Sequence, residues 1–518
     1  MEKYPWWTEG QKRLADEVED FADEVLPRVA EAVYLKEHPR DILRKIAEKG
    51  WFGVLVPEEY GGMGKNGGVT GCCIISEGLC KAGFIGGLFF STMFGGVNQL
   101  VNFGTDEQKE RWLPRVAKGE LLGAIALTEP FVGSDAGGVM TRARREGDEY
   151  VINGKKRFVS NTGVADVYLV YARTSDDPAD VQSRRHMTAF IVEKGTPGFS
   201  VEKVNELAVF DGVRNGVLDF NDVRVPAENV VGGEGNGWNV MINGLNFERL
   251  MIAVGVVAGM REAIRYSLFF TERRVQFGLR TIDFESNQYK IADMIIRYQT
   301  ARLMTYYTAY LMDQGLDPSI ESNVAKIYAT EACREAAIDA LQVAGGDAFT
   351  KFYPIEMVYR DAKISEVGAG TNEVLRRLIT GLARRRMAEE FKPPKRRIHP
   401  TLRIPIPYFK NPPEIIPKPV QKDLESREGA VLEVLAVDYF VNPGLHMKLE
   451  ELGEETGLPD DELMEAITSL ERKNLVHVWR DWRGRARLVK ATYEGLRKAK
   501  PPEFYKWFPP WSKEDEIF

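Results

Sequence analysis

The order of patterns along the 518-residue chain predicts an α+β protein whose helices and strands lie in separate regions. Apolar residues recur at helical spacing from about Trp7 to Leu122. Short strand-like runs follow, punctuated by Asn153-Gly154 and Pro197-Gly198 turns, and long helical stretches return from about Trp238 to Arg386. Helices, then strands, then helices indicate segregated layers, and this order does not fit a βαβ fold.

Three domains are expected in the first three quarters of the chain. A helical domain at 1–122 is predicted by periodic stretches such as QKRLADEVEDFADEVLPRVAEAV. An antiparallel β-domain at 123–236 is predicted by runs such as EYVINGKKRFVSN, ADVYLVYAR and HMTAFIVEK. A second helical domain at 237–387 is predicted by GLNFERLMIAVGVVAGMREAIRYSLFFTERR.

The remaining quarter predicts an appendage. A proline-rich linker is expected at 388–425, a small domain at 426–500 and a tail at 501–518. The small domain resembles a winged helix, because two helices flank a Gly-Leu-Pro turn ahead of a two-stranded ribbon. Its second helix carries five acidic residues that would repel phosphates: Asp460, Asp461, Glu462, Glu465 and Glu471. Protein–protein contact or oligomer assembly is therefore favoured over DNA binding.

The composition is typical of a soluble globular protein. The chain is 44% hydrophobic and 28% charged, as a soluble globular protein is, and no run of about twenty apolar residues is evident to span a membrane. The N-terminus has neither a signal-peptide core nor an Arg-rich transit character, so a cytoplasmic location is expected. A net charge of -7 makes nucleic acid an unlikely partner. Four cysteines without a C-x-x-C pair and five scattered histidines predict no metal site.

The most informative segment runs from Leu122 to Asn161. It contains Thr128-Glu129-Pro130, then Gly133-Ser134-Asp135, then Phe158-Val159-Ser160-Asn161. In order and spacing these resemble the signature of acyl-CoA dehydrogenases. The resemblance implies that family's fold: an N-terminal α-helical domain, a middle β-domain and a C-terminal four-helix bundle. It also implies FAD as cofactor.

The same resemblance assigns roles on the β-domain. Thr128 matches the residue at the pyrimidine side of the flavin, Phe158 the aromatic residue near the ring, and Ser160 the hydroxyl that reaches flavin N5. A donor at N5 stabilises the charge that arrives with the hydride. Ser134 matches a hydroxyl that contacts the pantetheine of the substrate.

Two further motif sets resemble the FAD-binding parts of the family. Arg274-Val275-Gln276-Phe277-Gly278 matches R-x-x-F-G, so Arg274, with Phe277 beside it, is expected to hold the FAD pyrophosphate across a dimer interface. The family glutamine seven residues after Gly278 is Glu285 here, which puts one adenosine contact in doubt. Gln342, Gly345 and Gly346 match the segment beside the ribityl-phosphate chain, and Thr371 a threonine near the flavin.

The catalytic base is expected at Glu248. Many relatives take it from an E-G-T loop, but the corresponding residue in Gly368-Ala369-Gly370-Thr371 is Ala369. The nearby Glu366 and Glu373 are out of register and read as solvated or salt-bridged carboxylates. The isovaleryl-CoA and long-chain branches carry the base on the first long helix after the β-domain, and Glu248 matches it there.

Three other residues complete the expected substrate site. Arg249 matches a family arginine near the acyl-CoA. Asn246 occupies a position often held by aspartate, on the CoA side. The resemblance also implies that the backbone N–H of Ala369 binds the thioester carbonyl, which acidifies the α-carbon.

The resemblance thus implies α,β-dehydrogenation of an acyl-CoA in fatty acid or amino acid degradation. A branched or cyclic acyl group is preferred and a long one stays open. Expected partners are an electron-transfer flavoprotein and further copies of the chain, as a homodimer or homotetramer. An acyl-CoA oxidase, an enoyl-CoA reductase and a non-catalytic flavin-binding scaffold remain as alternatives.

Overall fold

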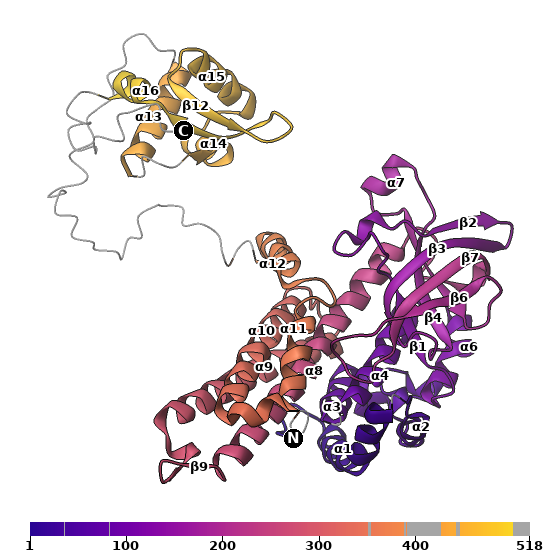
Figure 1. The fold of residues 1–518 in the computed structure, drawn as a ribbon. Coiled ribbons are helices and arrows are strands. Elements are labelled where there is room, and N and C mark those ends of the chain that lie inside the picture. The colour runs from indigo at the N-terminus through magenta and orange to yellow at the C-terminus, as the bar shows by residue number, and fades with distance from the viewer. Residues whose placement is uncertain are drawn as a thin grey trace. The chain divides into compact units, whose positions relative to one another are not determined.

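The computed structural model describes residues 1–35, 37–81, 83–350, 354–387, 390, 426–441 and 446–500 (Figure 1). The chain divides into two compact units, Met1–Phe391 and Lys392–Phe518, and each is described by itself. The expected linker at 388–425, apart from Glu390, and the expected tail at 501–518 lie outside the described residues.

The first unit begins with helices packed around one apolar core. Helix α6 starts with a capping box, in which Thr105 and Gln108 each accept a hydrogen bond from the other's backbone N–H. The irregular turn η4 (Met93–Val97) breaks at Gly95 and Gly96. A Cβ on Gly95 would lie 2.5 Å from the Ala124 nitrogen, so glycine lets η4 approach the β-domain. The helices are α1 (Glu9–Leu35), α2 (Arg40–Glu48), α3 (Gly68–Cys80), α4 (Phe84–Thr92), α5 (Asn98–Phe103) and α6 (Asp106–Ala117).

The middle region is a β-domain with its own buried core. Its sheet has the order β6-β7-β3-β2-β4-β5-β8, with β1 paired to β4, and the short helix α7 (Pro178–Gln182) follows β4. The strands are β1 (Gly123–Ala126), β2 (Arg142–Glu146), β3 (Glu149–Ser160), β4 (Val167–Arg173), β5 (Met187–Glu193), β6 (Phe199–Val204), β7 (Asn215–Pro226) and β8 (Val230–Val231).

The expectation of a purely antiparallel β-domain is wrong at two pairings. Strand β1 runs parallel to β4, and β2 contacts β4 in parallel at Arg142 and Arg173. A parallel pair needs a long connection, and the loop and the β2–β3 hairpin between β1 and β4 provide it. Short turn signals in the sequence reveal hairpins but not pairings of this kind.

A second helical region completes the first unit. Helix α10 packs against α8, α9 and α11, and its face is rich in alanine, which lets the helices approach closely. A hairpin of β9 (Val275–Gln276) and β10 (Leu279–Arg280) joins α8 to α9. The helices are α8 (Gly237–Thr271), α9 (Glu285–Asp313), α10 (Glu321–Ala344), α11 (Ile355–Ser365) and α12 (Asn372–Arg386).

Helix α8 is long and apolar enough to cross a membrane by length and composition, which the sequence analysis did not expect of any segment. Within the protein, however, 67% of its most apolar window is buried. Core helices pass the same test, so this is weak evidence for a membrane span.

The second unit has its own apolar core. Its elements are α13 (Ser426–Val441), β11 (Met447–Lys448), α14 (Leu449–Thr456), α15 (Asp460–Arg472), β12 (Val476–Arg480), β13 (Ala486–Ala491) and α16 (Tyr493–Ala499). The strands form a sheet in the order β11-β13-β12. The expected two-stranded ribbon therefore has a third, two-residue strand, too short for a sequence pattern to reveal.

Candidate active site

Glu248 lies in an apolar stretch of α8 and is itself half-buried. Phe247, Leu250 and Met251 around it are buried. The Glu248 carboxylate accepts no hydrogen bond from any residue that the structure describes. Burial raises its pKa to about 8 from 4.5, while the positive charges of Arg249 and Lys326 act in the opposite direction. A carboxyl group with this pKa is suited to take up a proton near neutral pH.

The neighbouring Arg249 connects α8 to the loop that follows α11. Its guanidinium is buried, and Nε donates to the Ala369 carbonyl at 3.2 Å while Nη1 donates to Asn246 Oδ1 at 3.0 Å. The structure thus brings Asn246, Arg249 and Ala369 together. Asn246 is nearly buried and is engaged with Arg249, so its side chain has a structural task inside the protein.

The Ala369 backbone N–H makes no hydrogen bond within the described chain, whereas its carbonyl is held by Arg249. Ala369 also has a φ of 54°, in the left-handed region that favours glycine. A free backbone donor on a constrained loop is what a developing negative charge on a thioester oxygen requires.

Glu366 and Glu373 are placed as the sequence analysis expected. The Glu366 carboxylate is paired with Arg334 and Lys363, each at 2.6 Å, and its pKa is lowered by hydrogen bonds from these two cations against the effect of burial. Glu373 is exposed in the first turn of α12, where hydrogen bonds from its own backbone N–H and from Thr371 lower its pKa. Neither carboxyl group has the raised pKa of Glu248.

The β-domain presents an aromatic surface and two hydroxyl groups. Phe158 occupies a β-bulge in the β3–β7 ladder with a φ of 58° and is 52% exposed. The Thr128 and Ser160 hydroxyls make no hydrogen bond within the described residues. The buried Asn161 Oδ1 also has no partner. An exposed aromatic ring beside unsatisfied polar groups fits the flavin that the sequence resemblance implies.

A buried ion pair holds the Thr128 segment in place. Lys156 Nζ lies 2.7 Å from Glu129 Oε1, with both side chains almost fully buried. Glu129 also accepts hydrogen bonds from the backbone N–H groups of Met140 and Thr141. The glutamate of the T-E-P motif therefore anchors the loop onto β3, a role that the motif alone does not reveal.

Five predicted cofactor residues lie at the end of the second helical region that is far from the β-domain (Figure 1). Arg274 and Phe277 belong to the β9–β10 hairpin, which Figure 1 shows at the end of the bundle far from the β-domain. The end of α10 lies beside the start of α9, since Asp339 pairs with Lys290 and Arg297. The three cofactor residues that follow Asp339 at the end of α10 are exposed: Gln342, Gly345 and Gly346.

Of the remaining predicted residues, the structure describes Ser134 and Thr371 but not Tyr353. Ser134 is exposed on the loop after Thr128. Thr371 caps α12, where its Oγ1 accepts a hydrogen bond from Val374 N at 3.3 Å and its hydroxyl bonds to the Glu373 carboxylate. Tyr353, which belongs to the third motif set, lies outside the described residues.

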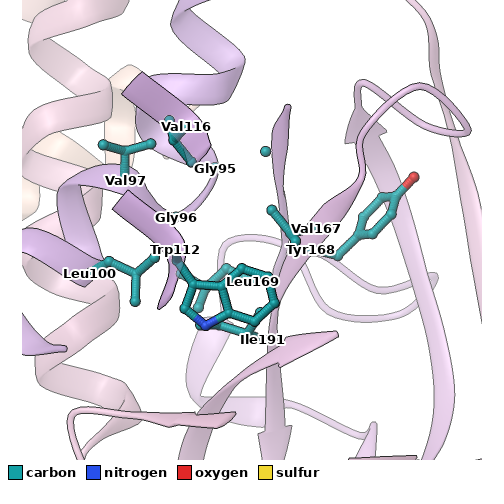
Figure 2. A pocket seen from close by; sticks show the side chains of 11 residues that line it. Gly95, Gly96, Val97, Leu100, Trp112, Val116, Val167, Tyr168, Leu169 and Ile191 are labelled. Atoms are coloured by element: carbon teal, nitrogen blue, oxygen red, sulfur yellow. The ribbon is translucent and has the colours of Figure 1, made fainter. Parts of the chain in front are cut away.

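A small cavity of about 20 Å³ lies between η4, α5 and α6 on one side and β1, β4 and β5 on the other. Val97, Leu100 and Val116 face the strand that carries Val167, while the Tyr168 ring points away (Figure 2). This volume holds about one water molecule, and the apolar lining offers it no partners. The cavity is a dry packing gap and is separate from Glu248, which does not line it.

Sequence reasoning missed Lys326, a fully buried lysine on α10 whose ammonium contacts the Ala369 loop. One signal was available. In ESNVAKIYATEAC the positions at helical spacing around Lys326, such as Asn323 and Thr330, are small or uncharged, which indicates a buried face.

Comparison with known proteins identifies the family. Models of the acyl-CoA dehydrogenase N-terminal, middle and C-terminal domains match residues 8–120, 124–223 and 235–382. The chain is 36% identical over 375 residues to an acyl-CoA dehydrogenase of Bacillus subtilis (strain 168), which covers 72% of this chain and 97% of the relative. It is 38% identical over 371 residues to the acryloyl-CoA reductase (NADH) of Anaerotignum propionicum, covering 71% and 92%.

The fold is also that of the butyryl-CoA dehydrogenase from Megasphaera elsdenii, with a TM-score of 0.71 and 31% identity. This likeness covers 74% of the present chain and 100% of that one. The helical N-terminal, β middle and helical C-terminal regions of the first unit are therefore those of a known enzyme fold. The chain belongs to the acyl-CoA dehydrogenase family, FAD-dependent oxidoreductases that act on CH–CH groups.

Proposed function

We propose that this protein oxidises an acyl-CoA thioester to the 2-enoyl-CoA and that Glu248 removes the α-proton. FAD, when bound, supplies the acceptor for the β-hydride. The observation that carries the proposal is the Glu248 carboxyl group, which lies without a hydrogen-bond partner in the described chain and has its pKa raised to about 8 by burial. Its ionised form is a strong enough base to accept a proton from an acidified carbon.

Acidification of the α-carbon is the task of Ala369. A thioester α-proton is too weakly acidic for a carboxylate unless the carbonyl oxygen is stabilised as negative charge develops. The unpaired Ala369 N–H can donate to that oxygen, and one such donor contributes about 3 kcal/mol. The proton then moves from the substrate α-carbon to a Glu248 carboxylate oxygen.

The placement of the base on α8 agrees with what the loop offers. Ala369 has no group that accepts a proton, Glu366 is paired with two cations, and Glu373 is exposed. This arrangement supports the isovaleryl-type position of the base. A carboxylate moved from the loop to a helix also reshapes the acyl pocket, and we propose a branched or cyclic acyl group as substrate.

We further propose that two copies of the chain complete each FAD site. Thr128, Phe158 and Ser160 lie on the β-domain, whereas Arg274 and Phe277 lie at the far end of the bundle (Figure 1). One FAD cannot contact both groups within a single chain. Phe277 is 96% exposed and Val275 and Leu279 are more than half exposed, which suits an apolar subunit contact. This arrangement supports a homodimer or homotetramer.

The C-terminal unit is proposed to be a winged-helix domain that contacts protein. Its order of helix, short strand, two helices and two strands supports the fold. Its second helix, α15, has Asp460, Asp461 and Glu462 in the first turn. Negative charge on the helix that would enter a DNA groove opposes phosphate binding.

Reduction of an enoyl-CoA is the second candidate function, because a relative with 38% identity is an acryloyl-CoA reductase (NADH). Oxidase and reductase reactions use the same fold and differ in what exchanges electrons with the flavin. We propose an electron-transfer flavoprotein as the acceptor in the dehydrogenase direction. A flavin-binding scaffold is the alternative that the raised pKa of Glu248 argues against.

An anaerobic titration of the FAD-loaded full chain with straight, branched and cyclic acyl-CoAs tests the proposal. We expect one branched or cyclic member to bleach the oxidised flavin and an electron-transfer flavoprotein to restore its colour. Rapid restoration by O₂ instead would indicate an oxidase. A flavin that no acyl-CoA reduces, but that is reoxidised by an enoyl-CoA after chemical reduction, would indicate the reductase.

A further inference from the structure

One buried side chain holds the loop that carries Ala369. Lys326 on α10 is 0% exposed, and its Nζ donates to the Glu366 carbonyl at 2.9 Å, to the Gly370 carbonyl at 3.0 Å and to Asn372 Oδ1 at 2.8 Å. An ammonium group has three N–H donors, and all three are used here. The loop is thus tied to α10 both before and after Ala369.

The same loop is held from a second helix. Arg249 on α8 donates to the Ala369 carbonyl, and within the loop Asn372 N donates to the Glu366 carbonyl at 3.0 Å. The carbonyls of Glu366, Ala369 and Gly370 therefore all accept bonds from inside the protein. The Ala369 N–H is left without an acceptor in the described chain and is available to a substrate.

A lysine at this position carries an electrostatic cost. Burial lowers the pKa of Lys326 to about 8 from 10.5, and no carboxylate in the described chain forms an ion pair with it. The charged groups that influence it are Glu248 and Arg249 on α8, Glu366 on the loop and Glu373 on α12. An apolar side chain of similar volume would avoid the desolvation cost, so the charge calls for a role beyond packing.

We propose that Lys326 is a positioning residue for the reaction: it fixes loop 366–372 so that the Ala369 N–H is held toward the thioester carbonyl, and it supplies a positive charge beside Glu248. The inference rests on the proposed function. It adds that proton abstraction by Glu248 and stabilisation of the substrate oxygen depend on one shared cation. Loss of that cation should disturb the loop and the ionisation of Glu248 together.

The first test is amide hydrogen exchange of loop 366–372 in the FAD-loaded full chain. Lys326→Met should accelerate exchange in this loop, since two loop carbonyls and Asn372 lose their donor. Lys363→Met is the matched control. Lys363 contacts the same Glu366 at 2.6 Å, but through the carboxylate and from a side chain that is 64% exposed. Its loss should leave loop exchange at the wild-type rate.

The second test measures α-proton exchange with D₂O for an acyl-CoA whose β-carbon is replaced by sulfur. This probe can lose an α-proton but has no β-hydride to transfer. In Lys326→Met we expect exchange slower by about 10- to 100-fold, as for a displaced donor, with its pH midpoint moved upward because Glu248 loses a positive neighbour. Lys326→Arg keeps the charge and should retain a midpoint near that of the wild type, even if misplaced donors slow the rate.

Unchanged loop exchange together with an unchanged pH midpoint in Lys326→Met would overturn the inference. If Lys326→Met does not fold, Lys326→Arg and Lys326→Gln decide it, because Gln removes the charge and keeps a donor. A wild-type protein that neither exchanges α-protons nor is bleached overturns the proposed function, and with it the catalytic part of the inference. Loop amide exchange still decides separately whether Lys326 holds the loop.

Discussion

Three residues that sequence motifs assign to the site have a left-handed backbone conformation. Phe158, Phe277 and Ala369 have φ values of 58°, 50° and 54°, although none of them is glycine. Such conformations cost about 1–3 kcal/mol each and persist only where the surroundings impose them. All three were assigned to cofactor or substrate by sequence motifs. The β-bulge accounts for the backbone of Phe158, and the two-residue turn between β9 and β10 accounts for that of Phe277. Ala369 differs, because it lies in a loop that Arg249 and Lys326 hold.

The pKa of Glu248 predicts the pH dependence of proton abstraction. The ionised carboxylate is the reactive form, so the rate of flavin reduction by substrate should rise with pH up to about 8. An ordinary glutamate base would reach its plateau several pH units lower. Stopped-flow reduction between pH 5 and 10 measures this, and a rate independent of pH across the range would contradict the assignment.

The same shift has a consequence for stability. The pKa of Glu248 is raised in the folded protein, so the unfolded chain ionises first and folding loses stability as pH rises from 4.5 to about 8. Glu248→Gln does not ionise and should gain stability relative to the wild type over that interval, by about 1 kcal/mol after allowance for partial exposure. Equal stability differences at pH 5 and pH 9 would argue against a buried, shifted carboxyl group.

The sequence predicted the identity of Glu248 but not its environment. The motif G-L-N-F-E-R-L identified Glu248 as the candidate base. The loop position was excluded as the base because Ala369 has no carboxylate. The pKa of Glu248 is raised by burial within the fold and moderated by the positive charge of Lys326 on another helix, and one linear pattern reveals neither. Lys326 was not predicted, because two of its partners are backbone carbonyls some forty residues away along the chain.

Secondary-structure elements position the site through a few buried contacts. Helix α8 carries Asn246, Glu248 and Arg249 within one turn, and β3 carries Phe158 in a bulge and Ser160 just beyond it. The helix pattern was predictable from apolar periodicity. The bulge and the parallel β1–β4 pair were not, because turn residues report only local chain reversal.

The Glu129–Lys156 pair should be the main anchor of the Thr128 loop. Lys156→Met leaves a buried carboxylate without its cation and should lower the free energy of unfolding by about 3–5 kcal/mol and weaken FAD binding. The neighbouring Lys155→Met is the control, since its pair with Glu202 is about half exposed and should contribute less than about 1 kcal/mol. Urea unfolding of both variants measures the two losses in free energy of unfolding. Equal losses for Lys156→Met and Lys155→Met would contradict the prediction.

At the scale of the molecule, the two groups of FAD residues predict dependence on assembly. Arg274→Ala should weaken FAD binding by at least about tenfold, because a charged hydrogen bond to phosphate is lost. Arg273→Ala is the control, as that side chain is already engaged with Phe269 of α8. Dilution into the monomer range should release FAD from the wild type. FAD retained equally by both variants and by the monomer would contradict a shared site.

Removal of the C-terminal unit should leave FAD binding and flavin reduction unchanged. The first unit ends at Phe391, and the predicted site residues all precede it. A chain truncated after residue 391 should therefore keep its FAD and its rate of flavin reduction while changing its assembly or its protein contacts. Sedimentation and flavin absorbance test this, and loss of FAD on truncation would overturn it.

Whole-molecule organisation was predictable to different degrees. The succession of helices, strands and helices followed from periodicity, and the family followed from ordered motifs such as Thr128-Glu129-Pro130 and Phe158-Val159-Ser160-Asn161. The domain boundaries remain predictions, as does the four-helix count of the bundle. The separation of Arg274 from Ser160 required the three-dimensional path of α8, whose 35 residues span roughly 50 Å at 1.5 Å per residue.

The most direct test of the central claim compares Glu248→Gln with the wild type in anaerobic flavin reduction by the best acyl-CoA. Glu373→Gln serves as control, because this exposed carboxylate lies close to Ala369 in sequence but is assigned no role. We predict that Glu248→Gln retains FAD and binds the acyl-CoA yet loses nearly all reduction, while Glu373→Gln reacts as the wild type does. Reduction of Glu248→Gln at a rate near that of the wild type would show that another group removes the α-proton.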